Sequence, residues 1–531
     1  MQHIENFISR YPGKTFALLL LMAVPAFFFN LGLLPLFADE PTRANVALEM
    51  ILTGNFSVPT IGAEYYYNKP PLYNWLLAGI YQLSGFSEFA TRIPAIVPLF
   101  LFAITIYYFT TFFLRDKRIA LLSAMLCLVN GRMLIYDSML GHIDIFYSWL
   151  TFSSFMCIFY FYQKKQWFLL FLSSYILTAI AFLCKGMPSI LFQGLTIITL
   201  LVYSKNLKKL LSWQHILSGL IGVFIIACYF YNYSLHNPDL RGYFETIWDQ
   251  SSQRTAANAG FWKSIKHILL FPLEYIGHLF PASLLILFCF NKQFLKELWS
   301  NGFLKFCLLI FAANIWVYWL SPETRPRYLL MLFPLLFIIW SYAYYNTRNR
   351  QPLLNNVFEN ILIGLSIAVA LAVPAVFFFD IKKNIPFFDL KVAILFTLAC
   401  FFAFLIVKLK SSKMLAFLGV LLVLRLGFSW FVLPQRLLKD EGRYFKNVAE
   451  EMGSISGSKP FYFYQYHPQA ANIPFHDKLI FYIQRSMMKQ VKFIETDTVK
   501  GYYLTFDRDL KNRDAVLLKT YKGNLKLFKI E

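Results

Sequence analysis

The sequence predicts a mainly α-helical protein that crosses a membrane many times, and three observations support this. Hydrophobic residues make up 58% of the chain, charged residues only 15%, and the mean hydropathy is +0.51, unlike an average soluble domain. A helix needs about 20 apolar residues to cross a bilayer. On that rule about thirteen stretches qualify as spans, near residues 15 to 37, 92 to 114, 118 to 136, 142 to 162, 166 to 184, 187 to 203, 213 to 233, 276 to 291, 304 to 320, 327 to 345, 356 to 378, 386 to 408 and 413 to 433.

The turns between these stretches predict the orientation. If the spans alternate, most of the short basic turns fall on one side, and the positive-inside rule makes that side the cytoplasm. The first stretch is too long for a signal peptide and lacks a small-residue cleavage site, so we expect a retained anchor with a cytoplasmic N-terminus. The outer segments are then loops 38 to 92 and 234 to 275, the turn near 321 to 327 and the tail after residue 433.

The charge and the cysteines exclude some classes of protein. The formal net charge is +21, but much of the excess lies in the cytoplasmic turns, where it faces anionic headgroups. We therefore expect membrane lipids, and no nucleic acid, as its partners. All seven cysteines lie in or at the edges of apolar stretches, which predicts neither a disulfide framework nor a thiolate metal cluster.

The composition changes after Pro434. Charge rises, and short strand-like patterns such as KPFYFYQY and GYYLTF alternate with helix-like stretches, which is typical of mixed α/β structure. We therefore expect residues 1–434 to form the transmembrane domain and residues 435–531 a small periplasmic α/β domain. We find no internal repeat and no glycine-rich nucleotide loop.

The outer loop 38 to 92 is the most informative part of the chain. It begins ADEPTRANVALEM and continues through YYYNKPPLYNW, so that an acidic pair, two arginines and a lysine lie beside the first span. This string resembles the first outer loop of the bacterial lipid-A aminoarabinose transferases and of their relatives, the protein O-mannosyltransferases. In those enzymes a DE pair is followed by an arginine, a proline and then a tyrosine with KPPL.

The resemblance implies a glycosyltransferase of the C superfamily (GT-C) in the bacterial inner membrane. At the periplasmic face no nucleotide sugar is at hand, so such an enzyme needs a polyprenyl-phosphate sugar as its donor and no nucleotide cofactor. Cleaving the bond between sugar and phosphate, here with inversion, needs a carboxylate that takes the acceptor hydroxyl's proton. Fixed cations must also balance the charge that grows on the departing phosphate.

Asp39 and Glu40 are the first candidates for the carboxylate. They precede TRANVALEMIL, which predicts a short interfacial helix, and on local grounds they would cap it. The resemblance implies instead that Asp39 is the catalytic base and Glu40 its supporting neighbour.

Arg43, Lys69 and Tyr66 are candidate ligands of the donor phosphate. Arg43 lies about one helical turn beyond Asp39, where an ordinary ion pair is the plain alternative. Two prolines follow Lys69 and fix the backbone there, so its ammonium group projects from a rigid point, although an interfacial lysine can also simply reach the headgroups. The resemblance favours phosphate contacts for all three.

A metal site of the family type is not expected. Asn68 stands where the lipid-A enzymes carry a glutamate that helps to hold a metal ion, and the later outer loop has Asp249 near the place of the partner histidine. Arg254 in that loop matches an arginine of the family and is a further candidate for the phosphate. Asp249 or Glu64 could still hold a hard cation weakly.

Two charged residues at the ends of later spans complete the expected site. Asp144, in SMLGHIDIFYSWL, resembles the second acidic motif of the family, and an acid there is costly unless it is paired or functional. Asp144 could therefore be a site residue or a structural ion-pair partner, and both interpretations stay open. Lys185, in LCKGMPS, matches the family's lysine before glycine and proline and is a candidate second phosphate contact, although it could form a plain turn.

The segment SPETRPRYLLMLFP resembles the loop that enters a later span of the family. It makes Tyr328 a candidate donor contact, and Arg325 and Arg327 candidate contacts of the carrier lipid.

A transporter or lipid flippase is the alternative function. Transporters tend to show internal repeats and ionisable residues near mid-bilayer, whereas here the distinctive charges gather at one face. The enzyme is therefore favoured. Its acceptor stays open among lipid A, a glycan and a protein hydroxyl.

Overall fold

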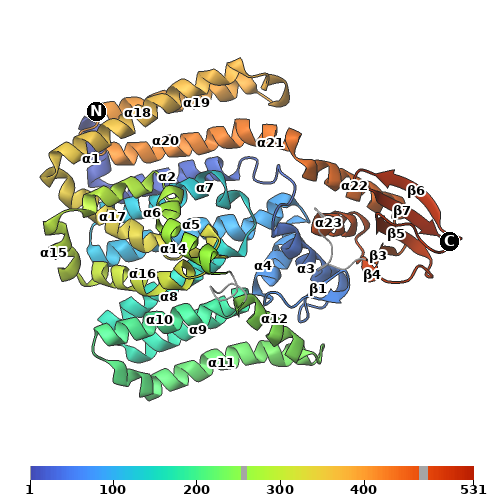
Figure 1. Ribbon diagram of the computed structural model, residues 1–531. Coiled ribbons are helices and arrows are strands. Elements are labelled where there is room, and N and C mark those ends of the chain that lie inside the picture. Colours follow the sequence, from blue (N-terminus) through green and yellow to red (C-terminus); the bar gives the residue numbers. More distant parts are fainter. Residues whose placement is uncertain (1, 253–259, 466–475) are drawn as a thin grey trace. The chain divides into compact units, whose positions relative to one another are not determined.

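The computed structural model describes residues 2–252, 260–465 and 476–531 (Figure 1). The chain folds into two compact units. The helical unit comprises Met1–Leu31, Ala95–Cys228 and Ile247–Gln435. The mixed unit comprises Gly32–Pro94, Tyr229–Thr246 and Arg436–Glu531.

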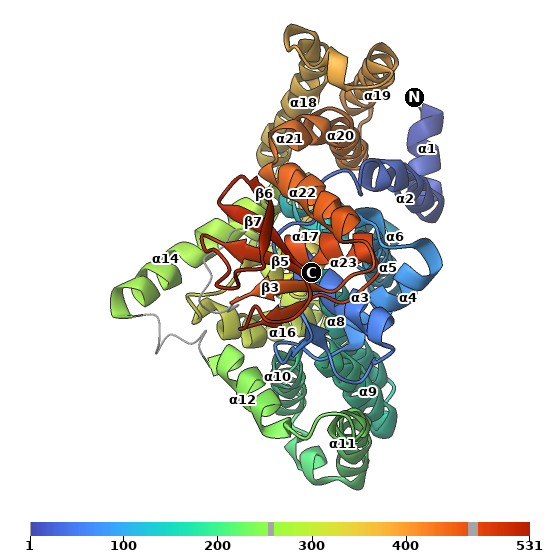
Figure 2. The same cartoon turned by 90° about the vertical axis from the view of Figure 1, so that its right-hand side faces the viewer.

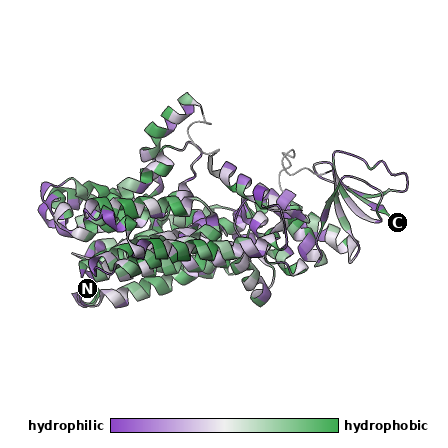
Figure 3. Ribbon diagram, turned by 90° about the horizontal axis from the view of Figure 1, so that it is seen from below, coloured by the Kyte–Doolittle hydropathy of each residue, from purple (hydrophilic) through white to green (hydrophobic). Residues whose placement is uncertain are grey.

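Long apolar helices dominate the helical unit, and their hydrophobic colouring is evident in Figure 3. Within the described ranges, eight helices are long and apolar enough to cross a membrane, or up to ten if two bent pairs each form one span. The eight are α5 (Glu88–Leu114), α8 (Ile143–Gln163), α9 (Trp167–Lys185), α11 (Trp213–Ser234), α16 (Gly302–Trp319), α18 with η6 (Pro352–Phe378), α19 (Phe388–Lys408) and α20 through α21 (Lys413–Lys439). The bent pairs are α1 (Gln2–Arg10) with α2 (Pro12–Phe28), and α14 (Phe261–His278) with η3 (Ala282–Cys289).

This number is smaller than the thirteen or so spans expected from the sequence, because three of the stretches form shorter helices. These are α6 (Lys117–Val129), α10 (Pro188–Tyr203) and α17 (Phe333–Thr347). At 1.5 Å per residue they are about 20 to 24 Å long, less than the roughly 30 Å thickness of the hydrocarbon core. Helix α6 is buried from Ile119 to Val129, so it packs inside the unit.

Short elements connect these helices. They are α7 (Gly131–Ile135), η1 (Asp137–Met139), η2 (Leu207–Leu211), α15 (Lys292–Ser300), η4 (Pro326–Leu329), η5 (Arg348–Arg350), η7 (Lys382–Asn384) and η8 (Phe428–Val432). Helix α12 (Leu240–Ser252) begins in the mixed unit and ends in the helical unit.

The mixed unit contains a five-stranded sheet with the order β4-β3-β5-β7-β6 (Figure 2). Strand β3 pairs in parallel with β4 and β5, whereas β7 pairs antiparallel with β5 and β6. The strands are β3 (Phe461–Tyr464), β4 (Lys492–Ile494), β5 (Gly501–Phe506), β6 (Val516–Tyr521) and β7 (Leu525–Ile530). Helices α22 (Glu441–Ser456) and α23 (His476–Met487) accompany the sheet. The α/β character expected of the C-terminal part is confirmed.

Elements from the loop 38 to 92 share their hydrophobic core with this C-terminal part. They are α3 (Glu40–Thr53), the hairpin of β1 (Thr60–Ile61) and β2 (Glu64–Tyr65), and α4 (Leu72–Ser84). One cluster of buried side chains includes Leu48 of α3, Tyr81 of α4, Phe481 of α23 and Leu504 of β5. The tail that begins near residue 435 therefore packs as one body with the loop that carries Asp39.

Candidate functional site

The start of α3 presents Asp39. The residue occupies the N-cap position with φ −83° and ψ −2°, but its carboxylate makes no capping hydrogen bond. Its side chain is exposed. The first helical hydrogen bond runs from Arg43 N to the carbonyl oxygen of Asp39, at 3.3 Å. The geometry therefore gives Asp39 no role as a side-chain cap, which was the plain alternative.

Glu40 is fully buried and forms an ion pair within the mixed unit. Its carboxylate accepts hydrogen bonds from Arg92 Nε at 2.8 Å and from Arg92 Nη2 at 3.0 Å. It also accepts one from the Phe37 backbone N–H at 2.8 Å. These bonds fix the first residue of α3 to Arg92 and to the backbone of Phe37. The sequence reasoning singled out no partner for Glu40, because Arg92 lies 52 residues away.

Arg43 and Tyr66 lie together in the same unit. Arg43 Nη2 donates a hydrogen bond to the Tyr66 hydroxyl, and the guanidinium lies 5.2 Å from the ring centroid. Both side chains are buried, yet Arg43 Nη1 has no hydrogen-bond partner among the described residues. Burial raises the pKa of Tyr66 and outweighs the opposite effect of Arg43. The phenol therefore stays protonated, and the pair can offer both an N–H and an O–H to an anion.

The segment around Lys69 is fixed by its backbone. Tyr66 N donates to the carbonyl oxygen of Pro59 at 2.8 Å, and the Tyr243 hydroxyl donates to the carbonyl oxygen of Lys69 at 3.3 Å. Pro70 and Pro71 follow, and α4 begins directly after them. The structure thus has the local order expected from KPPL, and Tyr243 of α12 adds a hydrogen bond that the sequence did not indicate.

A second ionic cluster lies in the helical unit, where α8 begins and α9 ends. The Lys185 ammonium group lies 2.5 Å from Asp144 Oδ1, and Arg327 Nε lies 3.1 Å from Asp144 Oδ2. All three side chains are buried. Gly186 ends α9 with φ +87°, a conformation that favours glycine. The structure therefore brings together three residues that the sequence singled out in three separate motifs.

Aromatic and imidazole groups surround this cluster. Lys185 Nζ lies 4.2 Å from the centroid of the Tyr328 ring and 4.9 Å from that of Tyr147. Arg327 Nη1 lies 3.2 Å from His142 Nδ1. Sequence reasoning named neither His142 nor Tyr147, although both flank Asp144 within SMLGHIDIFYSWL, so their closeness to that acid was the available signal.

The remaining candidates are exposed or lie outside the described residues. Arg325 is exposed, unlike its neighbour Arg327. Asn68, Glu64 and Asp249 are exposed as well. Arg254 falls outside the described ranges. In those ranges no group of three or more His, Cys, Asp or Glu side chains is arranged to hold a metal ion.

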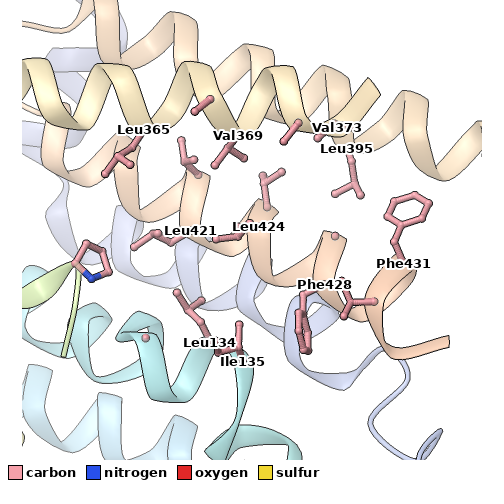
Figure 4. Close-up of a pocket in the computed structure, with 18 of the residues that line it drawn as sticks. Leu134, Ile135, Leu365, Val369, Val373, Leu395, Leu421, Leu424, Phe428 and Phe431 are labelled. Carbon is pink, nitrogen blue, oxygen red and sulfur yellow. The ribbon is translucent and has the colours of Figure 1, made fainter. Parts of the chain in front are cut away.

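An apolar cavity of about 630 Å³ lies in the helical unit (Figure 4). Its walls come mainly from α7, α18, α19, α20 and η8, and they include Leu134, Val369, Leu421 and Phe431. Several lining side chains, among them Ile135 and Leu424, are exposed, so the cavity opens to the surface of the unit. Its walls can accept a hydrocarbon chain.

Three comparisons relate this geometry to known proteins. Residues 68–231 match the family model described as dolichyl-phosphate-mannose-protein mannosyltransferase. The chain is 24% identical over 374 residues to undecaprenyl phosphate-alpha-4-amino-4-deoxy-L-arabinose arabinosyl transferase 2 of Proteus mirabilis, which covers 67% of this chain and 64% of the relative. It is 28% identical over 279 residues to the arabinosyl transferase of Aeromonas hydrophila, and this alignment covers 49% of this chain and 50% of the relative. The alignments thus span between half and 64% of the length of these relatives.

The comparison of structures covers nearly the whole chain. The crystal structure of ArnT from Cupriavidus metallidurans bound to undecaprenyl phosphate matches with a TM-score of 0.69 at 16% identity, over 96% of this chain and 97% of that chain. The chain has the GT-C fold. The resemblance to the aminoarabinose transferases and protein O-mannosyltransferases is therefore confirmed, and the protein is a multi-pass membrane protein.

Proposed function

We propose that this protein is a membrane glycosyltransferase that moves a sugar from a polyprenyl-phosphate donor to a hydroxyl group of lipid A, a glycan or a protein. It acts at the periplasmic face of the bacterial inner membrane, with a cytoplasmic N-terminus. The observation that carries the proposal is that the start of α3, in the loop that resembles the family, presents the exposed side chain of Asp39 and, one turn later, the buried Arg43. Arg43 Nη1 has no hydrogen-bond partner among the described residues. The relatives, which are named as arabinosyl transferases, support an enzyme over a transporter.

In the proposed mechanism, Asp39 accepts the proton of the acceptor hydroxyl as this oxygen attacks the anomeric carbon from the side opposite the phosphate, so that the configuration inverts. A base in this position contributes about 10² to 10⁴ in rate. Glu40 holds the start of the helix through Arg92. Asp144 orients Lys185 and Arg327.

The donor phosphate accumulates negative charge as the sugar leaves. Arg43, Tyr66 and Lys69, which all belong to the mixed unit, are the proposed donors for it. Lys185 and Tyr328 are the other candidates that the resemblance implies. Arg254 is a further phosphate ligand. Donors fixed in advance stabilise the departing charge without reorganising during the reaction. We assign no metal to the reaction, and Asp249 and Glu64 remain the weak candidates for a cation.

The lipid part of the donor needs an apolar site, and the cavity between α7, α18, α19 and α20 suits an isoprenoid chain. If it holds the chain, Val369→Trp, which fills the cavity, raises the KM of a long-chain donor several-fold and leaves a short-chain analogue unaffected. Leu371→Trp, on the exposed surface of the same helix, is the control. Equal effects on both donors would remove the cavity from the proposal. Arg325 and Arg327 are the other candidates for contacts with the carrier.

The function is tested by the release of polyprenyl phosphate from a radiolabelled donor by the purified protein. Asp39→Asn should lower release at least about a hundredfold without lowering the melting temperature. The control is Asp509→Asn. Asp509 is an exposed residue in the loop between β5 and β6, and this variant should retain wild-type turnover. Release by Asp39→Asn at the wild-type rate contradicts the assignment of the base. Mass spectrometry of lipid A and of glycoproteins, from cells with and without the protein, identifies the acceptor.

A further inference from the structure

The C-terminal part contacts α3 directly through the first turn of α23. Thr42 Oγ1 donates a hydrogen bond to Asp477 Oδ2 at 2.5 Å. Asn45 Nδ2 donates to the carbonyl oxygen of Asp477 at 2.8 Å, and Gln484 Nε2 donates to Asn45 Oδ1 at 3.3 Å. These bonds reach α3 on both sides of Arg43. They come from residues more than 400 positions away in the chain.

A second set of contacts holds the far end of α3 and the hairpin that follows. The buried Glu49 carboxylate accepts hydrogen bonds from Gln490 Nε2 at 2.6 Å, from Thr60 Oγ1 at 2.7 Å and from Gly62 N at 2.6 Å. The Phe493 backbone N–H donates to the carbonyl oxygen of Gly62 at 3.2 Å. The hairpin leads straight to Tyr66 and Lys69, so the C-terminal part fixes the segments that carry all the proposed phosphate ligands of the mixed unit.

Gly62 permits this contact by its own geometry. Its φ is +63°, and a Cβ atom there would lie 2.3 Å from the Phe493 ring. A side chain at this position would be strained and would also displace the ring. The hairpin and the C-terminal strand β4 therefore meet at a point where only glycine fits.

Asp477 provides a negative charge near Arg43 but forms no direct ion pair with it. Burial disfavours the ionised carboxyl group, but the hydrogen bond and positive charge of His476, 2.7 Å away, the hydrogen bond from Thr42 and the more distant charge of Arg43 outweigh it. The pKa of Asp477 therefore lies below its ordinary value. No carboxylate lies within ion-pair distance of Arg43 among the described residues. A counter-charge at longer range lowers the cost of burying an arginine and leaves its N–H groups available.

We infer that Asp477 is a positioning residue, which holds Arg43 ready for the donor phosphate through Thr42 and through its charge. The C-terminal part would thus belong to the donor-binding apparatus although none of its residues needs to touch the donor. This inference rests on the proposed function, in which Arg43 binds the phosphate. Asp477 acts as a charged hydrogen-bond acceptor that positions Arg43, and Arg43 in turn binds the anion.

Kinetics of two single variants and their combination test the inference. Asp477→Ala and Thr42→Val each remove the same hydrogen bond, from opposite sides. Each should raise the KM of the polyprenyl-phosphate donor about tenfold, the effect of about 1.4 kcal/mol, and change kcat less than about threefold. The double variant should be little worse than Asp477→Ala alone, because Thr42→Val removes only a hydrogen bond that Asp477→Ala has already removed.

Asp497→Ala is the matched control within the same unit. Asp497 is buried and accepts hydrogen bonds from the backbone N–H groups of Lys511 and Asn512, at 2.6 and 2.7 Å. Its loss destabilises the C-terminal part without removing a contact to α3. A KM increase in Asp497→Ala that equals the increase in Asp477→Ala overturns the inference, since general loosening would then suffice.

Hydrogen–deuterium exchange separates this inference from the proposed function. The amides of α3 should exchange faster in Asp477→Ala than in the wild type, whereas Asp497→Ala should leave them unchanged. Unaltered exchange in α3 overturns the inference even if the enzyme is active. If the wild type releases no polyprenyl phosphate but Asp477→Ala still accelerates exchange in α3, the mechanical link stands and the proposed function is rejected. Thr42→Val keeps the test available if Asp477→Ala fails to fold.

Discussion

The cluster around Asp144 in the helical unit and the site around Arg43 in the mixed unit balance buried charge in different ways. In the helical unit, Asp144 contacts both Lys185 and Arg327, so each cation has a direct counter-ion. In the mixed unit, Arg43 is just as buried but meets a phenol, and one of its N–H groups has no partner among the described residues. Paired charges hold a structure together, whereas an arginine with an unused donor is prepared for a ligand.

The energetic reason lies in the cost of desolvation. Removing one partner of a buried pair leaves a bare charge and costs about 3 to 5 kcal/mol. Removing a buried charge that lacks a direct partner relieves such a cost instead. The two arrangements therefore predict opposite signs for the effect of substitution on stability.

Asp144→Asn should produce the largest loss of stability. Lys185 and Arg327 would remain buried without a carboxylate, at a cost of about 3 to 5 kcal/mol, and the melting temperature in detergent should fall by several degrees. Adding Lys185→Met should recover part of the loss, because one of the two unbalanced charges is then gone. A melting temperature equal to that of the wild type would show that the cluster does not stabilise the helical unit.

Arg43→Gln should act on donor binding and leave stability intact. Charge-assisted hydrogen bonds contribute about 1.5 to 3 kcal/mol, so the donor's KM should rise by roughly tenfold to a hundredfold, while the melting temperature should stay the same or rise. Thermal unfolding and initial rates, measured on one preparation, decide the matter. A marked drop in melting temperature would place Arg43 with the structural charges instead.

The smallest effect concerns pH. Because the pKa of Asp477 is lower in the folded protein, its stabilising contribution is present above the pKa of the unfolded chain, about 3.9, and is lost as the pH falls through the lower folded value. The difference in melting temperature between the wild type and Asp477→Asn should thus be larger at pH 7 than near pH 3. A difference that is constant with pH would mean that the charge of Asp477 does not contribute.

The sequence predicted the fold well where the signal is local. Apolar stretches indicated the helical membrane fold, and the change after Pro434 indicated the C-terminal α/β structure, because both depend on composition and periodicity. The number of spans was harder to predict. The apolar stretch at 118 to 136 forms a buried helix of only 13 residues, α6, since packing against other helices satisfies it without a full crossing.

The candidate site was predictable residue by residue but not pair by pair. Asp144, Lys185 and Arg327 each stood out locally, yet only the folded chain shows that they meet. The partner of Glu40 is Arg92, and that of Thr42 is Asp477, 435 residues further on. Such pairings depend on tertiary structure, and no local pattern in the sequence encodes them.

The close approach of Gly62 and Phe493 has a consequence for engineering. A chimera that replaces the last hundred residues with those of a relative creates a new contact between the hairpin and strand β4. At Gly62 this contact has no room for even one additional carbon atom, because the ring of Phe493 lies against the backbone. Such a graft should succeed only when the incoming ring and the bare backbone opposite it are transferred as a pair. Residues 62 and 493 should therefore be replaced together or both be kept when the C-terminal part is exchanged.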